Sequence, residues 1–426
     1  MALDAATWRG RIAFREVALT PDWPIHLAAS GDTESLVSEV ADTITATCLL
    51  VESEGVTIVL VSVDLLYAGA GLTQSLSSAI DVVSGVDAGA VFATHTHFAP
   101  ATDGSKPLLG AADTRYVRTI SRQLEEAVAE LASGPRHDVY LTVTASSCEL
   151  GVNRRRKWPI VVSRSGVRLF PAVSGANFSG PKDEILTVAA FRSTDDDQPV
   201  AVVWNFACHP VGRFRSNQIS AHFIGTVREQ LRVLTDSMDL PVLFLQGFSG
   251  DVRPNHRDTN SPSKSGLTRA RLGPGYSTFT AAGYEEWTQQ MARQVATTFA
   301  LPPRPATGSG VGVLTCELPR KLFLEGSLSD QPVTFKSFTF GKDLTIVGTS
   351  MEAVTAYAQF VRSRMPDRWV MPAGCMDDVA GYAPTERMVK EGGYEAHDFC
   401  RSFSATAVPA SVEAAMLKGL KAVIPH

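Results

Sequence analysis

An almost uninterrupted apolar run at residues 56–66, VTIVLVSVDLL, constrains the fold more than any other feature of the sequence. Runs rich in β-branched residues are typical of strands that are buried on both faces of a sheet. Residues 72–85 follow with a helical apolar repeat that ends at a glycine, and residues 88–94 have the pattern of another buried strand. The three segments predict a β-α-β unit, and therefore an α/β fold.

Further segments along the chain fit the same class. Apolar runs of strand length occur at residues 200–206, 242–247 and 344–350, and helical patterns occur at 224–234 and 352–365. We therefore expect an α/β fold with a mixed β-sheet flanked by helices.

Three segments rich in glycine, proline, serine or arginine interrupt these patterns. Residues 153–184 and 256–278 are predicted to be long loops, and loops of that length usually serve a function. The proline-rich stretch 301–310 could be a linker between two domains.

Composition and charge exclude several classes of protein. Only 19% of the 426 residues are charged and 44% are hydrophobic, which excludes an intrinsically disordered chain. The net charge is −5 and the lysines and arginines are scattered, so the sequence has no basic footprint for nucleic acid and no polybasic membrane anchor. The run at 56–66 is broken by Asp64 and is too short to cross a bilayer, which needs about 20 residues.

The cysteines and the N-terminal segment bear on the cellular location. The 6 cysteines form no C-x-x-C pair, which argues against a disulfide framework or a zinc ribbon, so we expect reduced and mostly buried thiols. Asp4, Glu16 and Asp22 lie where a signal peptide would need an apolar stretch. These features predict a cytoplasmic protein.

Polar side chains follow several of the predicted strands. Because the loops at the carboxyl ends of strands converge in α/β proteins, these side chains are expected to meet. His95 and His97 follow residues 88–94 and point to the same side of an extended segment. His209 follows 200–206, and Glu352 follows 344–350. Two histidines and a glutamate at separate strand ends predict a zinc site with an open position for water.

Other interpretations of single residues stay open at this point. Glu352 also suits the start of a helix, where the helix dipole favours an acidic residue without any metal. Cys208 is either a soft metal ligand beside His209 or a buried, inert thiol. Asp64 either hydrogen-bonds to a ligand of the metal site or caps the turn after its strand.

Five segments in order carry a resemblance to a known family. They are ATHTHFAP, NFACHPVG, FLQGFSGDVRPN, the helix start at Glu352, and GYAPTERMVKEGGYEA. The chain thereby resembles, over essentially its whole length, the N-terminal catalytic domain of the neutral/alkaline non-lysosomal ceramidase family. The resemblance implies one zinc ion held by four residues and three further residues that line the site. The implied ligands are His95, His209, Glu352 and Tyr382, and the lining residues are His97, Arg154 and Tyr394.

The chain departs from the family pattern at two motif positions. Where the family has a serine in G-D-V-S-P-N, this chain has Arg253, which cannot act as a nucleophile because its guanidinium stays protonated. Arg253 suits either an anionic substrate or a structural ion pair. His222 stands where many relatives have an acidic residue, so it either changes the local charge or makes a second metal contact. The secretion signal and the C-terminal immunoglobulin-like domain of lipid-hydrolysing members are not found in this sequence, so long-chain ceramide is not the expected substrate.

The leading hypothesis is a zinc-dependent hydrolase that uses metal-activated water to cleave the amide bond of a small N-acyl or lactam-type substrate. His97 would act as general base, Tyr382 and Tyr394 would donate hydrogen bonds to the oxyanion, and Arg154 would hold a substrate carboxylate or that oxyanion. Arg253 would be a second substrate-binding residue. A zinc-containing binding protein without hydrolytic activity and a zinc esterase of the same fold are the alternatives. The oligomeric state stays open, and a homo-oligomer is compatible with the two long loops.

The proposed ligands also bear on the domain organisation. His95 and His209 precede the stretch 301–310, whereas Glu352 and Tyr382 follow it. A metal site divided in this way needs both halves packed as one unit. We therefore predict a single large domain over residues 1–426.

Overall fold

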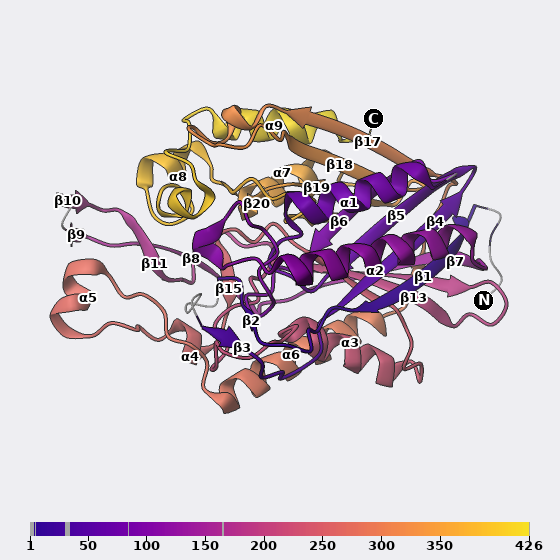
Figure 1. The fold of residues 1–426 in the computed structure, drawn as a ribbon, viewed down its shortest axis with the longest axis horizontal. Helices are drawn as coiled ribbons and strands as arrows, with labels where there is room; N and C mark the ends of the chain where they lie inside the picture. Colours follow the sequence, from indigo (N-terminus) through magenta and orange to yellow (C-terminus); the bar gives the residue numbers. More distant parts are fainter. Residues whose placement is uncertain (1–3, 5, 30–34, 84, 164–165, 426) are drawn as a thin grey trace.

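A large mixed sheet forms the centre of the molecule (Figure 1). The computed structural model describes all residues except 1–3, 5, 30–34, 84, 164–165 and 426, so parts of the N-terminal segment and of the predicted 153–184 loop lie outside the described residues. The strand order is β14-β13-β12-β7-β1-β4-β5-β6, and β16 also pairs with β7. The strands are β1 (Arg9–Ala18), β4 (Thr45–Ser53), β5 (Val56–Val63), β6 (Ala88–Ala93), β7 (His137–Ser147), β12 (Ile185–Ser193), β13 (Pro199–Phe206), β14 (Val242–Gln246) and β16 (Arg304–Pro305).

The predicted β-α-β unit is confirmed. Strands β5 and β6 are parallel, with Ile58 opposite Ala88, and helix α1 (Gly69–Val82) connects them. The helix begins at Gly69 rather than at residue 72, because the glycine adopts a positive φ of 77° that turns the chain into the helix. Strands β13 and β14 form a second parallel pair. The other pairs in this sheet are antiparallel, so the sheet is mixed as predicted.

A second, smaller sheet packs on one face of the large one. It contains β17 (Val311–Leu318), β18 (Val333–Phe340), β19 (Leu344–Thr349) and β21 (Trp369–Ala373). Alternating side chains of the two sheets, such as Leu60, Val203 and Ile346, form the buried core between them. The β-branched runs of the sequence therefore mark strands that are covered on both faces.

Helices cover the outer faces of both sheets. Side chains such as Val61 and Trp204, which alternate with the inner set, pack toward helices. In Figure 1, α3 lies beside α6, and α9 lies beside β17 and β18. The helices are α2 (Thr114–Ser133), α3 (Phe223–Leu234) and α6 (Ala281–Phe299) over the large sheet, and α7 (Thr355–Arg364) and α9 (Val412–Ala422) over the small one. The layers are thus helix, sheet, sheet, helix.

The prediction of a loop over residues 153–184 is wrong. This segment forms most of a three-stranded antiparallel sheet, in the order β11 (Ala172–Asn177), β8 (Gly151–Lys157) and β15 (Val252–Pro254), and a hairpin of β9 (Ile160–Ser163) and β10 (Gly166–Leu169). The strand β15 that completes the sheet lies far away in the sequence, so local composition could not reveal the pairing. Residues 256–278 are a loop interrupted by the short helices α4 (Arg257–Asn260) and α5 (Gly266–Leu272).

The stretch 301–310, considered above as a possible linker, does not separate two domains. Within it, β16 pairs with β7, and Thr307 forms a bridge with Thr7, so the segment belongs to the large sheet. Both halves of the chain therefore pack together. The remaining elements are β2 (Ile25–His26), β3 (Leu36–Val37), β20 (Glu352–Ala353), β22 (Tyr382–Ala383), α8 (Glu386–Glu391) and the 3-10 turns Pro107–Leu109, Arg320–Leu322 and Asp398–Phe403.

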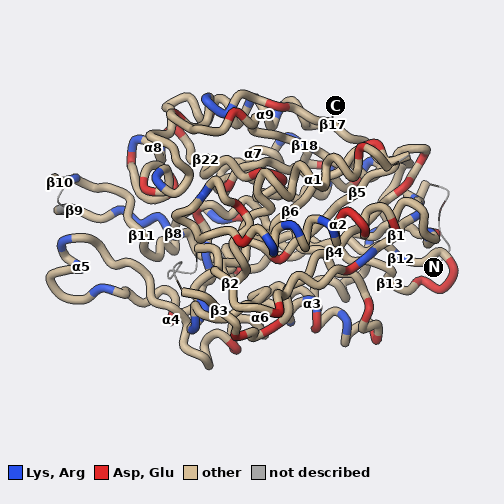
Figure 2. Tube along the Cα trace, in the orientation of Figure 1, with Lys and Arg blue, Asp and Glu red and all other residues tan. Residues whose placement is uncertain are grey.

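The two edges of the large sheet approach each other. The hydroxyl of Ser62 on β5 donates to the carbonyl of Phe244 on β14, with 2.8 Å between the oxygens, although β14 and β6 are the two edge strands. This curvature brings the carboxyl ends of β6 and β13 to one place. Charged residues are distributed over the whole trace and both signs are interspersed (Figure 2). Among the described residues, no helix is both long enough and apolar enough to span a membrane.

Candidate metal centre

Three histidines meet where the ends of β6 and β13 converge. Their ligand atoms all lie within 4.8 Å of one another. His95 and His97 follow β6, and His209 follows β13. His95 and His209 are 1% exposed, whereas His97 is half-buried and lies at the edge of the cluster. The backbone of His95 has a φ of 68°, which is uncommon for a non-glycine residue and occurs often at functional sites.

Each imidazole ring is held by a backbone carbonyl. Nδ1 of His95 lies 3.1 Å from the carbonyl oxygen of Leu66, and Nδ1 of His97 lies 3.3 Å from that of Ala29. Nδ1 of His209 lies 2.8 Å from the carbonyl oxygen of Ser249. Because a carbonyl can only accept, each Nδ1 carries a proton, and in a neutral ring Nε2 is then the atom with the free lone pair. A carbonyl that accepts from the other ring nitrogen is usual for histidines that bind metals.

Glu352 and Tyr382 complete the centre from the small sheet side. Oε2 of Glu352 lies 3.2 Å from Nε2 of His95 and 3.2 Å from Nε2 of His209. The Tyr382 hydroxyl also lies 3.2 Å from Nε2 of His209. Glu352 and Tyr382 are both 3% exposed. The prediction that Glu352 begins a helix is wrong. Glu352 pairs with Tyr382 in the short strands β20 and β22, and helix α7 begins only at Thr355.

The arrangement fits a divalent metal ion. Within the described residues, Nε2 of His95 and Nε2 of His97 are buried and make no hydrogen bond, which is costly unless another partner binds them. The four candidate ligand atoms are of types that such an ion binds. They are Nε2 of His95, Nε2 of His209, a carboxylate oxygen of Glu352 and the phenol oxygen of Tyr382. The geometry therefore makes this a candidate metal centre.

The electrostatics of the cluster also call for a cation. Burial lowers the pKa of His209 to about 4, which keeps the ring neutral as a metal ligand must be. Burial also lowers the pKa of His97. Although burial opposes ionisation of Glu352, the charge of His95 and a hydrogen bond to His209 hold its pKa well below the usual range. Burial likewise opposes the charged form of His95, yet Cys375 and Glu352 raise its pKa. One positive charge is thus favoured beside Glu352, and either a proton on His95 or a bound cation would supply it.

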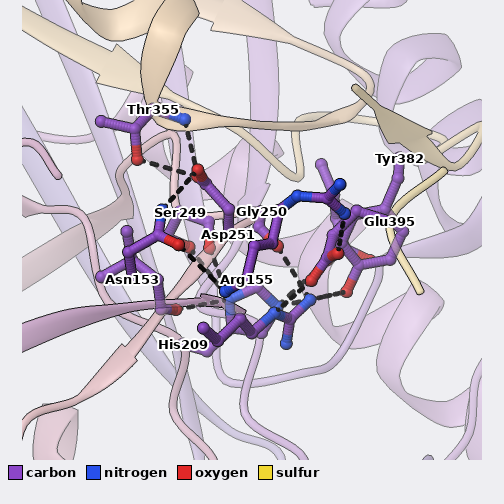
Figure 3. Close-up of polar contacts among 12 residues, drawn as sticks. Asn153, Arg155, His209, Ser249, Gly250, Asp251, Thr355, Tyr382 and Glu395 are labelled. Atoms are coloured by element: carbon purple, nitrogen blue, oxygen red, sulfur yellow. Dashed lines mark hydrogen bonds and ion pairs between the residues drawn. The ribbon is translucent and has the colours of Figure 1, made fainter. Parts of the chain in front are cut away.

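An ion-pair network lies next to Tyr382. Arg154 donates from Nε to Glu395 at 2.7 Å, and from Nη2 to the carbonyl of Gly250 at 2.8 Å and to the Tyr382 hydroxyl at 3.2 Å. Arg155 donates to the other oxygen of Glu395 at 2.6 Å, a contact visible in Figure 3. Glu395 therefore holds both arginines, and Arg154 links this network to the candidate ligand Tyr382.

Tyr394 lies on the more open side of the centre. It is half-buried, and its ring meets that of Tyr382 edge to face with 5.5 Å between centroids. The guanidinium of Arg154 lies 5.7 Å from the Tyr394 ring centre. His97, Arg154 and Tyr394 are the partly exposed residues of the predicted set, so a substrate would meet them first.

Asp251, in the turn after β14, ties the neighbouring segments together. Its carboxylate accepts two hydrogen bonds from Thr355, from the backbone N–H and the hydroxyl, at 2.8 Å each. It also accepts one from Asn153 at 2.9 Å (Figure 3). The site therefore rests on a fully hydrogen-bonded carboxylate at the start of α7.

Arg253 and His222 lie outside the histidine cluster that the described residues form. Arg253 is 7% exposed, and no ion pair connects it to any carboxylate of the described residues. His222 is 1% exposed and stacks on Phe98, with 5.6 Å between ring centroids. Tyr284 and Trp287 also surround the His222 ring. His222 is not part of the histidine cluster found among the described residues.

Sequence reasoning missed three residues of the site. Tyr67 donates a hydrogen bond to Oε1 of Glu352, and Cys375 is buried against His95. Glu395 is the partner of Arg154. Tyr67 and Cys375 follow β5 and β21, so the strand-end rule that found the histidines would have found them too. Cys208 is a buried, free thiol outside the cluster, in line with the inert interpretation.

Comparisons with solved structures identify the class of fold. It is that of a ceramidase-like domain, and the candidate metal centre lies within the part of the chain that is matched. The crystal structure of neutral ceramidase from Pseudomonas aeruginosa superposes with a TM-score of 0.73 at 13% sequence identity, over 99% of this chain and 74% of that one. A ceramidase complexed with C2 superposes with a TM-score of 0.70 at 13% identity, over 96% of this chain and 74% of that one. No protein-family model and no curated protein sequence matches this chain.

Proposed function

We propose that this protein is a zinc-dependent hydrolase that cleaves the amide bond of a small N-acyl or lactam-type substrate. The observation that carries the proposal is the set of three Nδ1-anchored histidines around Glu352, in a fold shared with ceramidases. Titratable groups with strongly shifted pKa values that converge on one place are typical of active sites.

Four residues would hold the ion: His95, His209, Glu352 and Tyr382. A bound zinc ion would supply a water of lowered pKa and would polarise the scissile carbonyl. This chemistry needs no serine nucleophile, which agrees with Arg253 in the motif position. Tyr67 and the carbonyl of Leu66 would keep Glu352 and His95 in their orientations.

His97 would move the proton. Its ring is anchored through Nδ1, its Nε2 has no partner in the described part of the chain, and it lies at the exposed edge of the cluster. Nε2 can therefore take a proton from the attacking water and deliver it to the leaving amine.

Arg154 and Tyr394 would stabilise the charge that develops on the carbonyl oxygen. Arg154 is already oriented by Glu395, so little reorganisation is needed during the reaction. Its hydrogen bond to the Tyr382 hydroxyl places its positive charge next to the metal ligands. Tyr394 lies beside both on the open side.

The proposal is tested with purified, zinc-loaded protein and a panel of short N-acyl amino acids, lactams and simple esters. We expect amide hydrolysis that is abolished in Glu352→Ala, because that change removes the carboxylate between the two histidines. Tight binding of these compounds without turnover would instead identify a binding protein. Turnover of the esters alone would identify an esterase.

A further inference from the structure

Arg253 is a buried cation without an anionic partner. Its side chain is 7% exposed, and its Nε is buried without a hydrogen bond. Among the described residues, its guanidinium makes one cation–π contact, with the ring of Tyr276, whose centre lies 3.9 Å from the guanidinium carbon. The structural ion pair of Arg253 that the sequence left open is therefore not found among the described residues. Buried arginines are normally paired, so this one calls for an explanation.

The strand register turns Arg253 toward the active site. Arg253 on β15 is the register partner of Val152 on β8, so the two side chains share one face of the three-stranded sheet. Arg154 lies two residues beyond Val152 on the same strand and therefore also shares this face. Arg154 contacts Tyr382, so the face that carries Arg253 borders the metal centre.

The backbone on either side connects Arg253 to His209. The carbonyl of Val252, the residue before Arg253, lies 3.1 Å from Nδ1 of His209. Gly212, three positions after His209, lies against the guanidinium, since a Cβ on it would come within 2.9 Å of Nη2. Gly212 also has a φ of 88°, so a side chain there would strain the backbone as well as collide with the guanidinium. Because residue 212 is a glycine, the guanidinium of Arg253 has room beside the loop that follows His209.

The guanidinium remains charged in this environment. Burial lowers the pKa of Arg253 to about 10, and the nearby charge of Arg154 acts in the same direction. Arg154 has Glu395 as its counter-ion, whereas Arg253 has none among the described residues. A planar guanidinium with free donors suits bidentate binding of a carboxylate. Stacking on Tyr276 would orient the fork and compensate part of the desolvation.

We infer that Arg253 binds a carboxylate of the substrate, so that the enzyme acts on amides that carry a free carboxylate close to the scissile bond, as N-acyl amino acids do. This inference rests on the proposed amide hydrolase. It assigns the carboxylate to Arg253 rather than to Arg154, whose charge is already paired with Glu395 and whose Nη2 already donates to Gly250 and Tyr382.

The first test compares N-hexanoylglycine with its carboxamide, N-hexanoylglycinamide, and measures release of hexanoate. For the wild type we expect kcat/KM to be higher for the carboxylate by about tenfold or more, because charge-assisted bidentate contacts discriminate to that degree. Arg253→Gln should reduce the carboxylate to the level of the carboxamide, and Arg253→Lys should restore part of the preference. The matched control Arg156→Gln removes an exposed charge from the adjoining strand and should keep the preference.

The second test does not depend on turnover. It measures by calorimetry the binding of N-(butylsulfonyl)glycine, a sulfonamide that resists hydrolysis, and of its carboxamide. The wild type should bind the carboxylate about ten times more tightly, and Arg253→Gln should bind both equally. If amides are hydrolysed but neither assay shows a preference, the inference is wrong and the hydrolase stands. If the binding preference is found without any hydrolysis, the carboxylate site stands and the hydrolase is wrong.

Discussion

Glu352 and Tyr382 are register partners in the parallel strand pair β20–β22, and both side chains reach Nε2 of His209 at 3.2 Å. One short backbone ladder therefore places a carboxylate and a phenol beside the same imidazole. Because backbone pairing sets this geometry, the two oxygens are positioned before any ion binds. Such preorganisation is what a high-affinity metal site requires.

Tyr67 is expected to support the metal site through Glu352. Tyr67→Phe removes the hydrogen bond to Oε1 and should weaken zinc binding about 10- to 100-fold, as the loss of a hydrogen bond to a metal ligand commonly does. Competition with a chromogenic chelator measures the affinity. Tyr140→Phe is the matched control, since Tyr140 donates to the carboxylate of Asp197 outside the site. Equal zinc affinity in both variants would contradict the role of Tyr67.

His97 is expected to act in proton transfer rather than in holding the metal. His97→Ala should lower kcat for amide hydrolysis by about 10²- to 10³-fold, in the range of general acid–base catalysis, while the zinc content stays close to that of the wild type. Metal analysis and steady-state kinetics on the same preparation check both statements. A variant that loses its zinc would make His97 a ligand instead, which its position in the histidine cluster would permit.

Asp251 is expected to stabilise the fold. In Asp251→Asn an amide N–H₂ would face donors from Thr355 or Asn153, leaving buried donors without acceptors. The free energy of unfolding should fall by about 2–3 kcal/mol, measured by denaturant titration. Asp196→Asn, on an exposed turn, should change it by less than about 0.5 kcal/mol. An unchanged midpoint for Asp251→Asn would contradict the interpretation.

His222 is expected to make the stability depend on pH. Burial among aromatic rings lowers its pKa to about 3, and the charge of Arg213 acts in the same direction. In the unfolded chain its pKa is about 6.5, so below that pH the unfolded state binds more protons than the folded one. Its stabilising contribution is therefore complete above pH 6.5 and is lost as the pH falls toward 3.

The comparison of wild type with His222→Asn isolates this effect. Asparagine tolerates the positive φ of 58° at this position better than most residues. Between pH 6 and 4 the free energy of unfolding of the wild type should fall more steeply, by up to about 1.4 kcal/mol per pH unit. Parallel pH curves for the two proteins would show that His222 is protonated in the folded state.

The sequence predicted the features that depend on local patterns. The buried strands around residues 56–66 and 88–94 were predicted correctly, because the sequence of a strand covered on both faces is a continuous apolar run. His95, His97 and His209 were found because they directly follow such strands. The ceramidase-like fold followed from the order of five short segments.

The features that the sequence did not predict depend on distant pairing. Strand β8 was taken for a loop, because its partner β15 lies far along the chain and four of its own 7 residues are arginines or lysine, rather than the β-branched and aromatic residues that are enriched in strands. Glu352 was assigned to a helix start, because a two-residue strand paired with Tyr382 has no local signature. Whether Arg253 had a counter-ion depended on which side chains surround it, and only the structure shows that.

Metal analysis of the purified protein is the most direct test of the proposed zinc site. We expect close to one zinc ion per chain, and loss of that ion in His209→Ala and in Glu352→Gln while circular dichroism shows that both variants stay folded. Glu352→Gln keeps the shape of the side chain and removes the charge between His95 and His209. A folded wild type that contains no metal, and takes up none when zinc is added, would show that the protein is not a zinc hydrolase.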